Sequence, residues 1–237
     1  MLLIFISVFP GIVILLDIYF RDKYEKEPIG LLLKVFVGGL FSALATILFL
    51  SPIHSFFPEF YSVHESAFFK AFAGAAIPEE LFKFAFLYLI IWKNRNFNEN
   101  FDGIVYAVFV ALGFACFENV LYVTEYGAGV GIMRGIFAVP GHALDGVIMG
   151  YYFSLARFNP EKRSGYLLKS IVYPVIAHGV YDFLLFYASG IAEENPFMAG
   201  LAVIAFLIFI VALWRTGFRK IKQHVETSVF RTTARSI

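Results

Sequence analysis

The stretch that decides the fold is residues 73–83, which read Ala-Gly-Ala-Ala-Ile-Pro-Glu-Glu-Leu-Phe-Lys. They lie within an apolar run over 67–92 that is long enough to cross a membrane as a helix. Glu79 and Glu80 would then sit at membrane depth, where a carboxylate costs roughly 2.5–3.5 kcal/mol on insertion scales. A glutamate pair retained at this cost indicates a functional site inside the membrane.

The composition of the whole chain also indicates a polytopic membrane protein. Of its 237 residues, 59% are hydrophobic and only 16% are charged, whereas soluble domains are about 25% charged. The formal net charge of +1 gives no sign of a nucleic-acid partner. The single cysteine, Cys116, excludes an intrachain disulfide.

Seven apolar runs approach or exceed the length of about 20 residues that a membrane-spanning helix needs. They are 2–20, 30–50, 67–92, 102–124, 134–156, 167–189 and 197–214. Because backbone groups in lipid must be hydrogen bonded internally, we expect helices. The sequence therefore predicts an all-α fold, a polytopic bundle of about seven transmembrane helices. Residues 1–215 would form one integral membrane domain and 216–237 a short basic cytoplasmic tail. Gly146 and Gly150, four positions apart, predict close helix approach.

The distribution of basic residues predicts the orientation of these spans. Lys and Arg occur in the segments 21–26, 93–95, 157–163 and 215–235, and are absent from 51–66, 125–133 and 190–196. Basic loops stay in the cytoplasm, so we predict an outside N-terminus and a cytoplasmic C-terminus. Glu118, His142 and His178 would then lie roughly 10–17 Å from the outer ends of their helices. That depth is close to the one expected for Glu79 and Glu80.

Lys83 is placed to interact with the glutamate pair. It follows Glu79 by four positions and Glu80 by three, so on a helix it can reach one of the two carboxylates. Two carboxylates close together in a low dielectric supply a general acid or base. We interpret Glu79 and Glu80 as catalytic and Lys83 as a supporting residue. The alternative is a purely structural ion pair between Glu79 and Lys83.

Two histidines in later spans each precede an acidic residue. Asp145 follows His142 by three positions, and Asp182 follows His178 by four. A carboxylate at this spacing can hold an imidazole tautomer or orient the ring as a metal ligand. We therefore predict that His142 and His178 are catalytic and that Asp145 and Asp182 support them.

The fourth span contributes Glu118, which shares a helical face with Tyr122 and has Asn119 beside it. We interpret Glu118 and Asn119 as supporting residues of the same site. Asp17 and Arg134 lie near span ends, and we interpret both as reaching the membrane interface.

Two mechanisms of hydrolysis are open for this set of residues. In one, Zn²⁺ is bound by ligands drawn from Glu80, Glu118, His142 and His178, and another carboxylate deprotonates the bound water. In the other, a glutamate activates water without a metal, and the histidines and Asn119 stabilise the oxyanion. Zinc is thus a possible cofactor and not a required one.

A different class of function is also compatible with the buried polar cluster. Proton- or ion-coupled transporters and channels place Glu, His and Asp inside their helical bundles. The absence of an obvious inverted repeat, and the gathering of the charges at one depth, favour the hydrolase over the transporter.

At these residues the chain resembles the PrsW family of intramembrane proteases, which is related to the CAAX prenyl endopeptidase and bacteriocin-immunity superfamily. The matching motifs occur in the family's order and each falls in its own span. They are Glu79-Glu80-x-x-Lys83, Phe114 through Asn119 with Tyr122, Pro140-Gly141-His142, and His178-Gly-x-Tyr181-Asp182.

The resemblance implies a multi-pass protein of the bacterial plasma membrane. Such proteins make the first, extracytoplasmic-side cut in a single-span anti-sigma factor during envelope-stress signalling. The implied partners are that substrate and the lipid bilayer, with no nucleic acid. The family's catalytic candidates correspond to Glu79, Glu80 and His178, with Glu118 and His142 in its other motifs. The superfamily has been described both as metal-dependent and as glutamate-type, so the resemblance leaves both mechanisms open.

Overall fold

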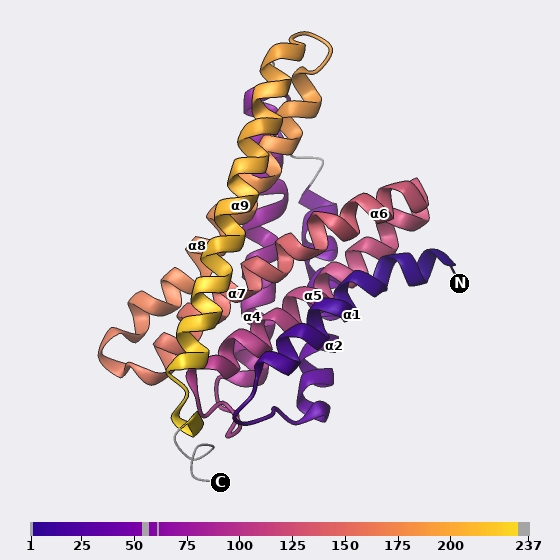
Figure 1. Cartoon of the computed structure of the whole chain (residues 1–237). Helices are drawn as coiled ribbons and strands as arrows, with labels where there is room; N and C mark the ends of the chain where they lie inside the picture. Colours follow the sequence, from indigo (N-terminus) through magenta and orange to yellow (C-terminus); the bar gives the residue numbers. More distant parts are fainter. Residues whose placement is uncertain (1, 54–56, 61, 232–237) are drawn as a thin grey trace.

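The computed structural model describes residues 2–53, 57–60 and 62–231, and this part of the chain contains nine α-helices (Figure 1). Short 3-10 or π segments lie at η2 (Phe72–Ala76), η3 (Pro160–Lys162) and η4 (Val229–Arg231). The α-helices are α1 (Leu2–Arg21), α2 (Ile29–Ile53), α3 (Val63–Ala71), α4 (Ile77–Ile91), α5 (Asn100–Tyr126), α6 (Ala128–Ile136), α7 (Ala138–Phe158), α8 (Arg163–Ile191) and α9 (Pro196–Glu226). The predicted all-α fold is confirmed.

Six helical runs within the described residues are long and apolar enough to cross a membrane. The predicted span over 67–92 corresponds to the run α3–η2–α4, which is not among the six. Its crossing of the membrane stays a prediction, as does the orientation of the bundle. The six runs are Leu3–Arg21, Ile29–Ile53, Asn100–Tyr126, Ala128–Phe158, Pro160–Ile191 and Pro196–Glu226.

Helix α5 forms the centre of the bundle. It packs against α1, α2, α4 and α7, and 78% of its apolar window is buried. The predicted close approach at Gly146 and Gly150 is confirmed, because a Cβ on Gly150 would meet the backbone of Gly103 and Ile104 on α5. Only 17% and 22% of the windows in α1 and α9 are buried, which suits helices that face lipid.

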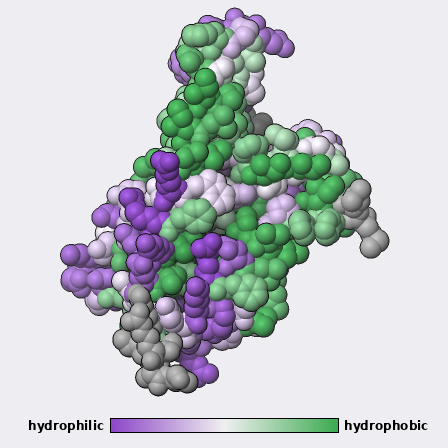
Figure 2. Space-filling model, viewed as in Figure 1, coloured by the Kyte–Doolittle hydropathy of each residue, from purple (hydrophilic) through white to green (hydrophobic). Residues whose placement is uncertain are grey.

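The outer surface separates by polarity. Helices α8 and α9 pack side by side and, with α3 against α8, extend beyond the rest of the bundle (Figure 1). Figure 2 shows apolar side chains along the shafts of the helices, and hydrophilic ones at the end near the C-terminus and at the opposite tip. This distribution is the one expected when lipid covers the shafts and water covers the ends.

A π-helical segment precedes the glutamate pair. In η2 the N–H of Ile77 bonds to the carbonyl of Phe72, five residues back. Pro78 has no N–H and would crowd the carbonyl four residues before it, so a wider turn here accommodates the proline. Gly179 of α8 packs against the ring of Phe72 with no room for a Cβ. The bulge is therefore fixed against α8.

The C-terminal region continues the last helix. Helix α9 continues through residue 216, where the tail was predicted to begin, as far as Glu226. Ile221 and His224 are buried, and His224 Nδ1 lies 2.9 Å from the carbonyl oxygen of Asn100. Residues 232–237 of the predicted tail lie outside the described residues.

Candidate active site

The predicted polar residues converge on one large cavity within the bundle. The cavity has a volume of about 1190 Å³. Six of the nine predicted site residues line it; Glu80, Lys83 and Asn119 do not, and their exposed fractions are 0%, 1% and 0%. The six are Glu79, Glu118, His142, Asp145, His178 and Asp182, contributed by α4, α5, α7 and α8.

Lys83 joins the glutamate pair to a histidine. Its Nζ lies 2.8 Å from Glu80 Oε1, 3.3 Å from Glu79 Oε2 and 3.0 Å from His142 Nδ1. The sequence predicted contact with one carboxylate, and the structure gives contact with both. The same Nζ lies 4.0 Å from the centre of the Phe114 ring. The ammonium is therefore surrounded by two carboxylates, an imidazole and an aromatic ring.

His178 is held between carboxylates. Its Nδ1 lies 2.8 Å from Glu80 Oε1, and its Nε2 lies 3.3 Å from Asp182 Oδ2 and 3.9 Å from Glu79 Oε2. The predicted pairing of His178 with Asp182 is confirmed. Because both ring nitrogens face carboxylate oxygens, the ring orientation is fixed and a protonated ring could donate on both sides.

His142 has partners other than the predicted one. Its Nε2 lies 3.1 Å from Glu118 Oε2, while its Nδ1 faces Lys83. An ammonium can only donate, so Nδ1 accepts and the Nε2–H donates to Glu118. The predicted pairing of His142 with Asp145 is wrong, because groups from α4 and α5 reach the imidazole first. Asp145 Oδ1 is buried without a hydrogen-bond partner among the described residues.

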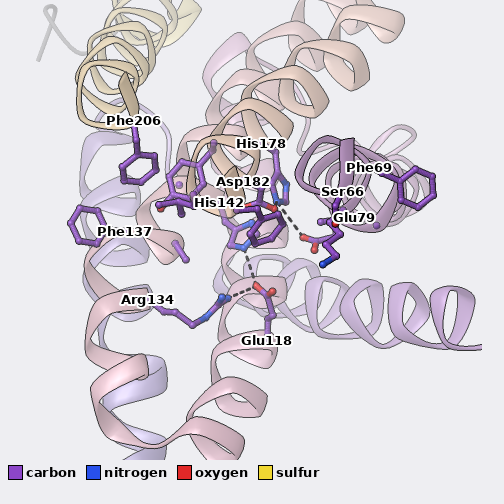
Figure 3. Close-up of a pocket in the computed structure, with 18 of the residues that line it drawn as sticks. Ser66, Phe69, Glu79, Glu118, Arg134, Phe137, His142, His178, Asp182 and Phe206 are labelled. Atoms are coloured by element: carbon purple, nitrogen blue, oxygen red, sulfur yellow. Dashed lines mark hydrogen bonds and ion pairs between the residues drawn. The ribbon is translucent and has the colours of Figure 1, made fainter. Parts of the chain in front are cut away.

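Arg134 is a site residue that the sequence interpretation missed. Its Nη2 donates to Glu118 Oε2 at 2.6 Å, its Nε donates to Asn119 Oδ1 at 3.2 Å, and its guanidinium lies 3.8 Å from the centre of the Tyr122 ring. Figure 3 shows Arg134, Glu118 and His142 linked in a row. The interpretation as an interface residue was wrong, because the guanidinium pairs with Glu118 and Asn119 on α5.

Asn119 acts behind the cavity wall. Its amide donates to the carbonyl of Ser7 on α1 at 2.9 Å, and its oxygen accepts from Arg134. Since Asn119 is fully buried, its predicted contact with an oxyanion is not found. The sequence did contain a signal for Arg134. Glu118 and Asn119 are two hydrogen-bond acceptors near the outer end of their span, and Arg134 is a cation near the start of the next span, at a similar depth.

The donor set around Lys83 fits a metal ion by residue type. Glu79, Glu80, His142 and His178 each offer a ligand atom, and these atoms lie within 4.8 Å of one another. Two imidazoles with carboxylates match catalytic zinc ligands. Glu80 Oε2 is buried and has no hydrogen-bond partner in the described part of the chain, so it is available as a ligand.

Comparison with known proteins gives a consistent result over nearly the whole chain. Residues 27–213 match the family described as "PrsW family intramembrane metalloprotease". Protease PrsW of Geobacillus kaustophilus is 38% identical over 93% of this chain and 91% of its own. Protease PrsW of Bacillus subtilis is 35% identical over 90% and 91%, and that of Clostridioides difficile 30% over 95% and 92%. No solved structure gives a significant match.

Proposed function

This chain belongs to the PrsW family of intramembrane proteases, and from that premise we propose that it cuts a single-span membrane protein inside the bacterial plasma membrane. The substrate we propose is an anti-sigma factor, cut first on the extracytoplasmic side in envelope-stress signalling. Membership of a protease family favours this function over the transporter alternative. The observation that best supports this proposal is the cluster of Glu and His side chains at one cavity.

Glu79 is the proposed general base. It lines the cavity, whereas Glu80 is fully buried and already binds Lys83 and His178. A base must reach the water whose proton it takes, and this requirement favours the carboxylate that faces the cavity. We assign Glu80 to holding Lys83 and His178 in position.

The proposed reaction is addition of water to the scissile amide. Glu79 takes a proton from water as the water oxygen bonds to the carbonyl carbon, and the carbonyl oxygen becomes an oxyanion. To stabilise this charge, an N–H of His142 or His178 on the cavity wall would turn from its carboxylate partner, Glu118 or Asp182, toward the oxyanion. The proton then passes to the amide nitrogen as the C–N bond breaks, which yields a carboxylic acid and an amine.

A metal ion, where bound, would be held by Glu79, Glu80, His142 and His178. A metal at such a site supplies polarisation of the water and the carbonyl. The metal requirement is measured by elemental analysis of the purified protein together with activity after chelation. Stoichiometric zinc and loss of activity on chelation would establish a metalloprotease.

The test of the proposed function is direct cleavage. Purified protein is incubated in detergent micelles with a panel of single-span bacterial membrane proteins that includes anti-sigma factors, and fragments are identified by mass. We expect one cut in an anti-sigma factor, near its extracytoplasmic membrane boundary, and no cut with the Glu79→Gln protein. Cleavage of unrelated spans only, or of none, would overturn the proposed substrate class.

A further inference from the structure

A second group of buried carboxylates lies far from the cavity. The loop between α1 and α2 meets the start of α5 there, at the end of the molecule near the C-terminus (Figure 1). Asp102 is sixteen residues before Glu118 on α5, a distance of about 24 Å along the helix. The group is therefore separate from the active site. We call it the loop cluster, and it consists of Glu25, Glu27 and Asp102.

The three carboxylates are close together and mostly buried. Each offers one oxygen, and the three oxygens lie within 4.8 Å of one another. The exposed fractions of Glu27 and Asp102 are 2% and 0%. One oxygen of each has a partner: Glu27 Oε2 accepts from the Tyr106 hydroxyl, Asp102 Oδ2 from the Glu99 N–H at 2.8 Å, and Glu25 Oε1 from the Asn98 amide at 3.2 Å.

The other oxygen of each carboxylate has none. Within the described ranges, Glu25 Oε2, Glu27 Oε1 and Asp102 Oδ1 are buried atoms without a hydrogen-bond partner. A buried acceptor left unpaired is unfavourable, and buried carboxylates normally bind a donor, a cation or a metal. The three carboxylates approach within 4.8 Å of one another and each keeps one buried oxygen without a partner, which favours a positively charged ligand here.

Neighbouring basic residues do not pair with these carboxylate oxygens. Lys26 donates to the carbonyl of Tyr19, and its Nζ lies 4.4 Å from the centre of the Tyr19 ring. No Lys or Arg forms an ion pair with the loop cluster among residues 2–53, 57–60 and 62–231.

We propose that Glu25, Glu27 and Asp102 bind a hard divalent cation of the Mg²⁺ and Ca²⁺ class. The side-chain donors are carboxylate oxygens, which these ions prefer over the nitrogen and sulfur ligands of zinc. Ligands on opposite sides of Ca²⁺ are about 4.6–5.2 Å apart and those of Mg²⁺ about 4.0–4.2 Å, so the spacing accommodates either ion. The cation ties the α1–α2 loop to the start of α5.

The test measures stabilisation of the full-length protein. Protein in detergent micelles is stripped with a chelator and dialysed, and its thermal unfolding is followed with added CaCl₂ or MgCl₂. At a cation concentration near 100 times Kd we expect Tm to rise by about 5–10 °C. The rise should be absent in Glu27→Gln and Asp102→Asn.

Two controls separate this site from other effects of cations. Glu79→Gln alters the cavity, and Asp17→Asn alters an exposed carboxylate that pairs with Arg21 at the end of α1. Both variants should keep the full rise in Tm. A rise that disappears in Glu79→Gln, persists in Asp102→Asn, or is absent from the unaltered protein with both salts would overturn the proposal.

A binding measurement covers the case in which the loop-cluster variants do not fold. Tb³⁺ replaces Ca²⁺ at oxygen sites and emits when a nearby tyrosine is excited. Tyr106 touches Glu27, so Tyr106→Phe should strongly reduce the sensitised emission. Competition by CaCl₂ or MgCl₂ then identifies the preferred ion. Emission that is unchanged in Tyr106→Phe, or that neither salt reduces, would contradict the site.

Discussion

At the scale of single residues, one buried ammonium organises the active site. Lys83 contacts Glu79, Glu80 and His142 at once and has an exposed fraction of 1%. A buried charge is tolerated only when it is paired and hydrogen bonded, so these four groups must fold together. Lys83 also sets the tautomer of His142, and Glu80 sets the orientation of His178.

The two glutamates should respond differently to substitution. In Glu79→Gln we expect cleavage to slow by about 10²–10⁴-fold, because the proposed general base is lost, while Tm stays close to that of the unaltered protein. In Glu80→Gln we expect both activity and Tm to fall, because Lys83 and His178 lose a shared buried partner. The measurements are initial cleavage rate and thermal unfolding.

Glu59→Gln is the matched control, since Glu59 lines the same cavity but is exposed. It should leave both quantities unchanged. If Glu79→Gln cleaves at the unaltered rate and Glu80→Gln cleaves slowly, Glu80 is the general base and Glu79 the positioning residue.

Arg134 should act as a positioning residue. Arg134→Lys keeps the charge but cannot donate to Glu118 and Asn119 at the same time in the geometry of a guanidinium. Glu118 is then held less firmly beside His142. We expect kcat to fall by about 10–100-fold with little change in KM. Arg157→Lys, in the last turn of α7, serves as the control. Equal rates for the two variants would remove Arg134 from the site.

At the scale of elements, close packing of α5 against α7 places Glu118 beside His142. The contact relies on small residues, because Gly146 and Gly150 bring α7 onto the backbone of α5. The π segment η2 has the matching role on α4, where it accommodates Pro78 just before the glutamates. Both features set the helix rotations that direct the polar side chains into one cavity.

Packing of α5 against α7 can be tested at a single glycine. In Gly150→Ala the new Cβ would meet the backbone of Gly103 and Ile104, which cannot move aside. We expect a loss of about 1–3 kcal/mol in the free energy of unfolding. Gly165→Ala in α8 is the control, since nothing lies within 4 Å of its Cβ, and alanine should stabilise that helix by up to about 1 kcal/mol. Both values come from reversible unfolding in detergent, and equal effects at the two positions would contradict the account of the interface.

At the scale of the whole molecule, the orientation in the membrane decides which side of the substrate is cut. The basic loops lie at the end that carries the loop cluster, and the active-site cavity lies toward the other end. If basic loops are cytoplasmic, the cavity is nearer the outside. An extracytoplasmic cut requires this arrangement.

Cysteine labelling in intact cells checks the predicted orientation. The one native cysteine, Cys116, is buried, and a Cys116→Ala background removes it. A membrane-impermeant maleimide should label Glu193→Cys in whole cells but label Glu161→Cys only after lysis, since both positions are exposed at opposite ends of α8. The reverse pattern would invert the topology and place the cavity on the cytoplasmic side.

The sequence by itself determined the helical class, the helix boundaries to within a few residues in most cases, and six of the polar residues that line one cavity. Length, hydropathy and charge are local properties, so they can be evaluated without knowing which helices touch. The sequence also identified the pairs set by spacing on one helix, Glu79 with Lys83 and His178 with Asp182.

Only the tertiary structure decided the partners that come from different helices. It assigned Glu118 to His142 in place of Asp145, brought Arg134 into the site, and distinguished Glu79, which lines the cavity, from Glu80, which does not. It also assembled the loop cluster, in which Asp102 is more than seventy residues along the chain from Glu25 and Glu27. The physical reason is that helix rotation and depth, which fix such contacts, depend on packing against neighbours and leave no periodic trace in the sequence.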